Sequence, residues 1–127
     1  MSSFLAELWA LRDGLFLCVQ AQVQALIVEM DAKALVDAFS NQNNSNVITS
    51  PLMEDSRQLA TQIPQVRFMH VYREANRVAD HLAKLGSSME SDFVVFSSPP
   101  VDIVSVVEAD CRGLFVNRMC PVPVLSV

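Results

Sequence analysis

The chain is short of basic residues. Its 127 residues include nine Lys and Arg against fourteen Asp and Glu, which gives a formal net charge of −5 and a pI near 4.8. Contacts with phosphate draw most of their affinity from Lys and Arg, so this balance works against non-specific binding to a polyanion. In other respects the composition is that of one globular domain with a modest core, because 51% of the residues are hydrophobic and 18% are charged.

Cysteine pairs, a leader and a long apolar run are also missing. The three cysteines, Cys18, Cys111 and Cys120, are odd in number and lack the close spacing of a zinc or redox motif, which predicts reduced thiols in an intracellular protein. No basic region precedes the apolar N-terminus, which argues against a signal peptide. The least charged run, residues 14–28, contains three glutamines and is too short to span a bilayer. We therefore expect a soluble protein with no membrane partner.

The apolar spacing predicts a first helix over residues 4–20. Glu7 shares a face of this helix with Ala10, Leu11 and Gly14, and such neighbours suggest a close packing surface or a functional site. The simpler interpretation is an acid in the first helical turn, which the helix dipole favours without any function. Both interpretations of Glu7 stay open at this point.

A short apolar run, ALIVEM at residues 25–30, predicts a buried strand, and AKALVDAF after it predicts a helix. Asp31 lies between the two. Open α/β sheets place their ligands at the carboxyl ends of parallel strands, which makes Asp31 a candidate for chemistry. Asp is equally favoured as a helix N-cap, where it needs only backbone donors.

A further helix and strand follow a polar loop. Ser50 and Pro51 predict the start of the helix, and VRFMHVY at residues 66–72 alternates as a strand. Two strands joined through helices predict a parallel pair with a right-handed crossover. His70 is most simply a strand residue, and His81 is most simply a helix residue that faces solvent.

The stretch VYREANRVADHLAKL, residues 71–85, predicts a strand end, a polar turn and an amphipathic helix that stops at Gly86. Asp80 projects from the edge of the apolar stripe of this helix, on the side shared with Asn76 and Lys84. A carboxylate at this position can face a cleft without being buried alone. Asp80 is therefore our first candidate for a catalytic residue.

Three carboxylates, Glu7, Asp31 and Asp80, thus fall on a helix, a strand end and a second helix. The crossover between the strands could bring them to one end of the sheet. Paired Mg²⁺ ions about 4 Å apart need several oxygen ligands of this kind to activate a water in phosphodiester cleavage. The acidic composition does not exclude such a site, because bound metal ions offset carboxylates locally.

The segments AELWALRDGL, VEMDAKALVDA and VYREANRVADHLAK together resemble the ribonuclease H-like, reverse-transcriptase-associated domains abundant in plant genomes and retroelements. The resemblance implies an α/β fold with a parallel strand pair flanked by helices. It also implies a two-metal, Mg²⁺-dependent hydrolysis of the RNA strand of an RNA–DNA hybrid. Glu7, Asp31 and Asp80 would be the catalytic residues and metal ligands. Asn76 would start the last helix and could also contact the substrate.

We expect an incomplete ribonuclease H-like domain at residues 1–86. A tail follows at residues 87–127, for which the sequence predicts no defined structure. Family members carry an antiparallel three-stranded meander before the glutamate helix, and its first strand bears another catalytic aspartate. Only three residues precede Phe4 here, so we expect impaired catalysis and an apolar edge on the 25–30 strand that favours self-association or pairing with another chain. Three interpretations stay open: a ribonuclease H-type enzyme, an inactive retroelement-derived remnant that binds nucleic acid, and a plain interaction module.

Overall fold

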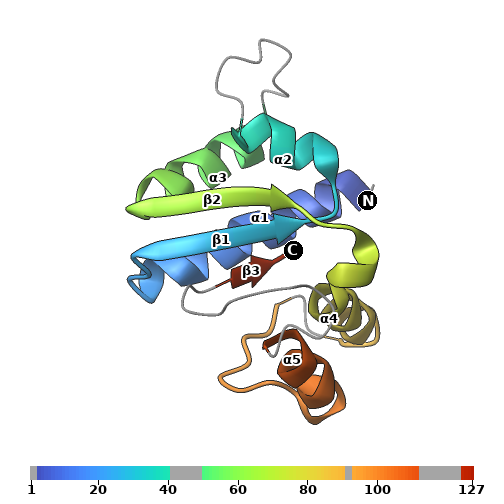
Figure 1. Cartoon of the computed structure of the whole chain (residues 1–127). Helices are drawn as coiled ribbons and strands as arrows, with labels where there is room; N and C mark the ends of the chain where they lie inside the picture. Colours follow the sequence, from blue (N-terminus) through green and yellow to red (C-terminus); the bar gives the residue numbers. More distant parts are fainter. Residues whose placement is uncertain (1–2, 41–49, 91–92, 112–123) are drawn as a thin grey trace. The chain divides into compact units, whose positions relative to one another are not determined.

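The computed structural model describes residues 3–40, 50–90, 93–111 and 124–127, which form two compact units (Figure 1). Unit 1 comprises Met1–Val71 and Val122–Val127, and unit 2 comprises Tyr72–Pro121. Unit 2 is thus inserted in the chain between two parts of unit 1. The domain boundary that we expect after residue 86 stays a prediction.

Unit 1 is built from helices and parallel strands. In chain order its described elements are α1 (Ser3–Gln20), β1 (Ala25–Met30), α2 (Lys33–Ser40), α3 (Pro51–Thr61), β2 (Gln65–His70) and β3 (Val124–Ser126). The strands form one sheet in the order β2-β1-β3, and β1 runs parallel to both neighbours. The predicted α/β fold with a parallel strand pair is confirmed, because β1 and β2 pair along their full length.

The sequence does not predict the third strand. β3 lies in the tail of residues 87–127, for which the sequence predicts no defined structure. It pairs with β1 over Ile27–Glu29. We expected this edge of β1 to be apolar and unpaired. That expectation is wrong for the middle of the strand, where β3 pairs with Ile27–Glu29. Leu125 of β3 fits against Gly14 of α1, where a Cβ atom would come within 2.7 Å of the Leu125 Cδ1 atom. A glycine at this helical position thus leaves room for the strand.

The core of unit 1 lies between the sheet and the helices. In Figure 1, α1 and α3 lie on the same side of the sheet, and the two helices pack against each other. The buried core residues are Leu8, Leu11, Leu15, Leu26, Val28, Met30, Leu35, Val36, Met53, Ala60 and Ile63. Alternate residues of β1 supply one layer of this core, as expected for a strand with one face on helices. β1 is therefore well packed along its length, including the carboxyl end that precedes Asp31.

Local contacts explain two of the helix ends. Ser50 caps α3 as predicted, because its side chain accepts a hydrogen bond of 3.1 Å from the backbone N–H of Met53. At the end of α1 the chain turns through Gln22, whose φ of 57° lies in the left-handed region. The backbone N–H of Val23 donates to the Cys18 carbonyl at 3.1 Å, which completes a Schellman turn into β1.

The described part of unit 2 is helical apart from its connecting segments. A 3₁₀ helix (Arg73–Ala75) leads into α4 (Arg77–Ser87), and a second 3₁₀ helix (Val101–Ile103) leads into α5 (Val104–Cys111). α4 continues for one residue beyond Gly86, where we expected it to stop. The tail that begins at residue 87, for which the sequence predicts no defined structure, thus contains the helix α5.

Two smaller expectations concern cysteines and membranes. Cys18 is a free, partly buried thiol, and burial raises its pKa. The side chains of Cys111 and Cys120 lie outside the described residues. Within the described ranges, no helix is long and apolar enough to cross a membrane.

Candidate functional site

Glu7 lies on α1 at the edge of the core and is partly buried. The helix has no acid in its first turn, so the interpretation of Glu7 as a first-turn acid is wrong. The neighbours Leu8 and Leu11 are fully buried, and the Oε2 atom of Glu7 is itself buried. Glu7 therefore directs part of its carboxylate inward, as the small and apolar residues on its face suggested.

Asp31 follows the last residue of β1, at the carboxyl end of the central strand of the sheet. In the described part of the chain its side chain makes no hydrogen bond, so the N-cap interpretation is not realised. Within the first turn of α2, the backbone N–H groups of Leu35 and Val36 donate to the carbonyl of Ala32, the residue before the helix. Asp31 thus lies at the carboxyl end of a parallel strand, where open α/β sheets place ligands, and its role as a ligand stays a prediction.

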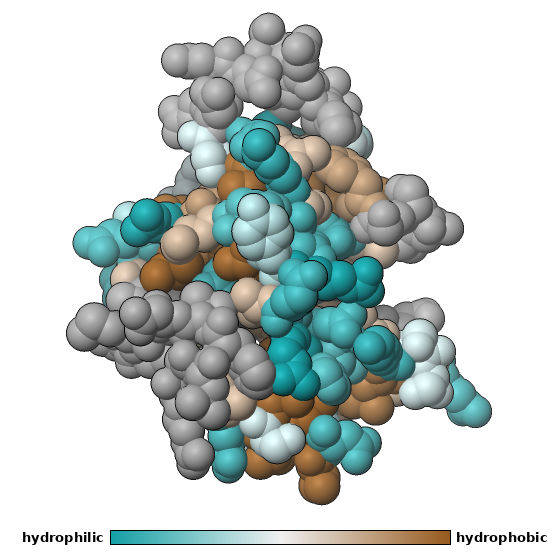
Figure 2. All heavy atoms as spheres, turned by 45° about the vertical axis from the view of Figure 1, so that its right-hand side comes forward, coloured by the Kyte–Doolittle hydropathy of each residue, from teal (hydrophilic) through white to brown (hydrophobic). Residues whose placement is uncertain are grey.

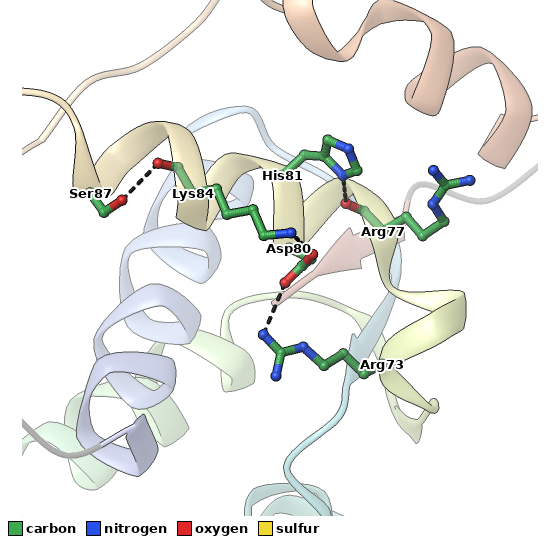
Figure 3. Close-up of polar contacts among 6 residues, drawn as sticks. All are labelled: Arg73, Arg77, Asp80, His81, Lys84 and Ser87. Atoms are coloured by element: carbon green, nitrogen blue, oxygen red, sulfur yellow. Dashed lines mark hydrogen bonds and ion pairs between the residues drawn. The ribbon is translucent and has the colours of Figure 1, made fainter.

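Asp80 lies in the first turn of α4, and its carboxylate is held between two cations (Figure 3). Arg73 Nη2 lies 3.1 Å from the Oδ1 atom, and Lys84 Nζ lies 3.1 Å from the Oδ2 atom. The side chain of Asp80 is 24% exposed. The hydrogen bond from Lys84, followed by that from Arg73, lowers the pKa of the Asp80 carboxyl. Asp80 is therefore ionised at neutral pH.

Asn76 and His81 have separate positions on the same helix. Asn76 occupies the N-cap position of α4, as predicted, although its side chain makes no capping hydrogen bond and is only 4% exposed. The Nδ1 atom of His81 lies 2.8 Å from the Arg77 carbonyl oxygen, within the helix (Figure 3). His81 therefore contacts its own helix instead of Asp80.

The two cations beside Asp80 are the part of the site that sequence reasoning missed. Lys84 follows Asp80 by four residues, a spacing that predicts an ion pair on a helix. Arg73 precedes Asp80 by seven residues and reaches it only because the chain folds back through the 3₁₀ helix before α4. The first signal was available in the sequence, and the second required the turn geometry.

The candidate acids are divided between the two units. Glu7 and Asp31 belong to unit 1, and Asp80 belongs to unit 2. Within either unit, the described residues bring no three His, Cys, Asp or Glu side chains together in a group that could hold a metal ion. The convergence of all three carboxylates stays a prediction.

Unit 1 also has a surface hollow of about 540 Å³, which lies between residues 25–27 and 64–67. These residues begin β1 and β2, so the hollow lies at the amino ends of the strands. Asp31 lies at the carboxyl end of β1. The hollow is therefore not part of the candidate acidic site.

Comparison with known proteins agrees with the α/β fold of the chain. The sequence model of the reverse transcriptase-like family matches residues 1–86, about two thirds of the chain, and the chain belongs to this family of ribonuclease H-like domains. It is also 31% identical over 108 residues to a protein from Arabidopsis thaliana that is provisionally named a ribonuclease H protein. That alignment covers 85% of this chain but only 17% of the length of the relative. No solved structure matches the chain.

Proposed function

We propose that this chain acts as a ribonuclease H-like domain that binds nucleic acid, and that hydrolysis of the RNA strand of RNA–DNA hybrids is impaired in it. The family membership supports binding to nucleic acid. The contacts of Asp80 support impairment, because each of its two carboxylate oxygens already pairs with a cation. A metal ion at Asp80 would have to compete with Arg73 and Lys84 for the same oxygens.

Glu7, Asp31 and Asp80 are the residues that would hold Mg²⁺. All three are carboxylates, the hard oxygen ligands that Mg²⁺ prefers, so the donor set fits the ion. Bound Mg²⁺ supplies an activated water and stabilises negative charge on the phosphate. The chain contributes an ionised carboxylate at Asp80 and a fixed strand end at Asp31. Asn76 lies four residues before Asp80 at the buried start of α4, where it would position this helix, and its direct contact with the nucleic acid stays a prediction.

A second observation on unit 1 supports impairment. The resemblance puts a further aspartate on a strand beside the 25–30 strand. The strand that pairs with β1 on the side away from β2 is β3, and its residues Val124, Leu125 and Ser126 include no acid. A two-metal site with fewer carboxylates holds its ions more weakly, and a lost ion removes one of the charges that catalysis needs.

The proposal can be tested with an RNA–DNA hybrid whose RNA strand carries a fluorescent label. We expect the purified chain to bind the hybrid and to cut it slowly or not at all when Mg²⁺ is titrated. Rapid cutting that disappears in Asp31→Asn would contradict impairment and favour an active ribonuclease H. Absence of both binding and cutting would contradict the proposal and favour an interaction module.

We also propose self-association through a strand edge as a secondary property. β3 covers only the middle of β1, and among the described strands the outer edge of β2 has no further partner strand. Unpaired edges offer backbone donors and acceptors to another chain. Light scattering over a range of protein concentrations tests this, and a constant monomer mass would contradict it.

A further inference from the structure

The surface around Asp80 differs in charge from the rest of the chain. Residues 73–84 contain three basic and two acidic residues, a local charge of +1 in a chain whose net charge is −5. The remaining residues therefore carry −6. Residues 73–84 therefore offer a polyanion a locally favourable charge on an otherwise acidic chain.

The two cations that contact Asp80 remain largely open to solvent. The side chain of Arg73 is 75% exposed and that of Lys84 is 72% exposed. An ammonium group has three N–H donors, and Lys84 uses one of them on the Oδ2 atom of Asp80. An anion can therefore bind Lys84 from the solvent side without removing it from Asp80.

Arg12 and Arg57 in unit 1 are held differently. Arg12 forms an ion pair with Asp13 at 3.1 Å and lies over the ring of Phe16. Arg57 lies over the ring of Phe39. These guanidinium groups pack against neighbours in their own unit. Arg73 and Lys84 instead extend from opposite sides toward one carboxylate (Figure 3).

We propose that Arg73 and Lys84 form a phosphate-binding pair that contacts the backbone of a bound nucleic acid. Asp80 sets the spacing of the two cations before the ligand arrives, because each of its oxygens holds one of them. Pre-set side chains lose less conformational freedom on binding than free ones. The guanidinium group can bind phosphate oxygens in a bidentate fashion, and the ammonium group acts as a point charge beside it.

This inference rests on the proposed function and names the ligand group at the same site. A phosphodiester backbone fits better than an isolated anion, since two neighbouring cations, Arg73 from the 3₁₀ helix and Lys84 from α4, match a repeating charge. The contacts carry no sequence information, because they address phosphate and not base edges. Binding through them is therefore expected to be similar for hybrids of different sequence.

The salt dependence of hybrid binding tests the assignment. Fluorescence anisotropy would be measured on the full chain between about 50 and 200 mM salt, with Ca²⁺ in place of Mg²⁺ so that binding is observed without cutting. We expect Lys84→Gln and Arg73→Gln each to reduce the slope of log K against log salt by about 1. Over this range the wild type would then lose about fourfold more affinity than either variant.

Two further variants serve as controls. Arg67→Gln removes one positive charge from an exposed position on β2 and should leave the slope near that of the wild type. Lys84→Arg keeps the charge and should restore the slope. Circular dichroism of each variant reports whether α4 is retained.

The outcomes distinguish a failure of the phosphate-binding pair from a failure of the proposed function. A wild-type slope in Lys84→Gln and Arg73→Gln, together with hybrid binding, would overturn the phosphate-binding pair and leave only an ion pair that supports the helix. Equal slope losses in Arg67→Gln and Lys84→Gln would show a general charge effect and would also overturn it. If the wild type does not bind the hybrid at all, both this assignment and the proposed function fail.

Discussion

The two units of this chain bury their apolar residues to different extents. Of the thirteen buried apolar residues in the described ranges, eleven belong to unit 1 and two, Ile103 and Val106, belong to unit 2. α4, which carries Asp80, has no buried residue of its own. Among the described residues, unit 1 therefore contains the larger hydrophobic core, and unit 2 presents Asp80 on a helix without buried residues.

Unit 2 also leaves apolar side chains in solvent. Four consecutive residues, Phe93–Phe96, are exposed, as are Val101 and Val104. Figure 2 shows hydrophobic side chains at the surface of this unit. Since burial of apolar surface is the main source of stability, we expect unit 2 to open more readily than unit 1. Glu7 and Asp31 therefore belong to the more stable unit, and Asp80 belongs to the less stable one.

Removing a core side chain from unit 1 should give the largest effect. Leu15 is fully buried, so Leu15→Ala should lower the free energy of unfolding by about 2 to 5 kcal/mol through lost burial and a cavity. The matched change in unit 2, Leu82→Ala, truncates a partly exposed residue of α4 and should cost about 1 kcal/mol or less. Urea unfolding followed by circular dichroism measures both. Similar losses in the two variants would remove the contrast between the units.

The glycines provide a second pair of substitutions, with intermediate effects. Gly14→Val should force Leu125 away from α1 and loosen β3, at a cost of about 1 to 3 kcal/mol. Gly86→Ala on α4 meets nothing within 4 Å and should be neutral or stabilising by up to about 1 kcal/mol. Hydrogen exchange at Ile27–Glu29 should speed up in the first variant only. Unchanged exchange in Gly14→Val would show that β3 does not depend on this contact.

The smallest expected effect is the titration of Asp80. Lys84→Gln removes the main cause of its lowered pKa and should raise the pKa of this carboxyl toward its ordinary value. The pKa of Asp80 is lower in the folded chain than in the unfolded chain. The ion pairs therefore stabilise unit 2 at pH values above the ordinary pKa of an aspartate. That contribution is lost as the pH falls through the folded value, below about pH 4. Carbon NMR of the Asp80 carboxyl measures the shift, and an unchanged pKa would show that Arg73 alone is sufficient.

Much of the fold could be predicted from local patterns. The apolar run of β1, the Ser50 cap of α3 and the amphipathic spacing of α4 each report on residues close in sequence, and the structure contains all three elements. β3 could not be predicted in this way. It has three residues, and its stability depends on pairing with a strand about a hundred residues earlier in the chain.

The candidate site shows the same division. The positions of Glu7, Asp31 and Asp80 on their elements could be predicted, because helix and strand periods determine where a side chain lies on its own element. The burial of the Glu7 Oε2 atom depends on packing between elements that are distant in sequence. Asp80 acquires Arg73 through a turn whose shape the residue types alone do not specify.

Patterns along the chain are sufficient to predict the helices within residues 4–86, the parallel strand pair, the family and the order of the three acids. The folded chain adds a distant strand that covers β1 and the fit of Leu125 against Gly14. It also adds Arg73 as a second partner of Asp80 beside Lys84. The physical reason is that pairing and packing depend on which residues meet in space, and a local pattern carries no record of partners far along the chain.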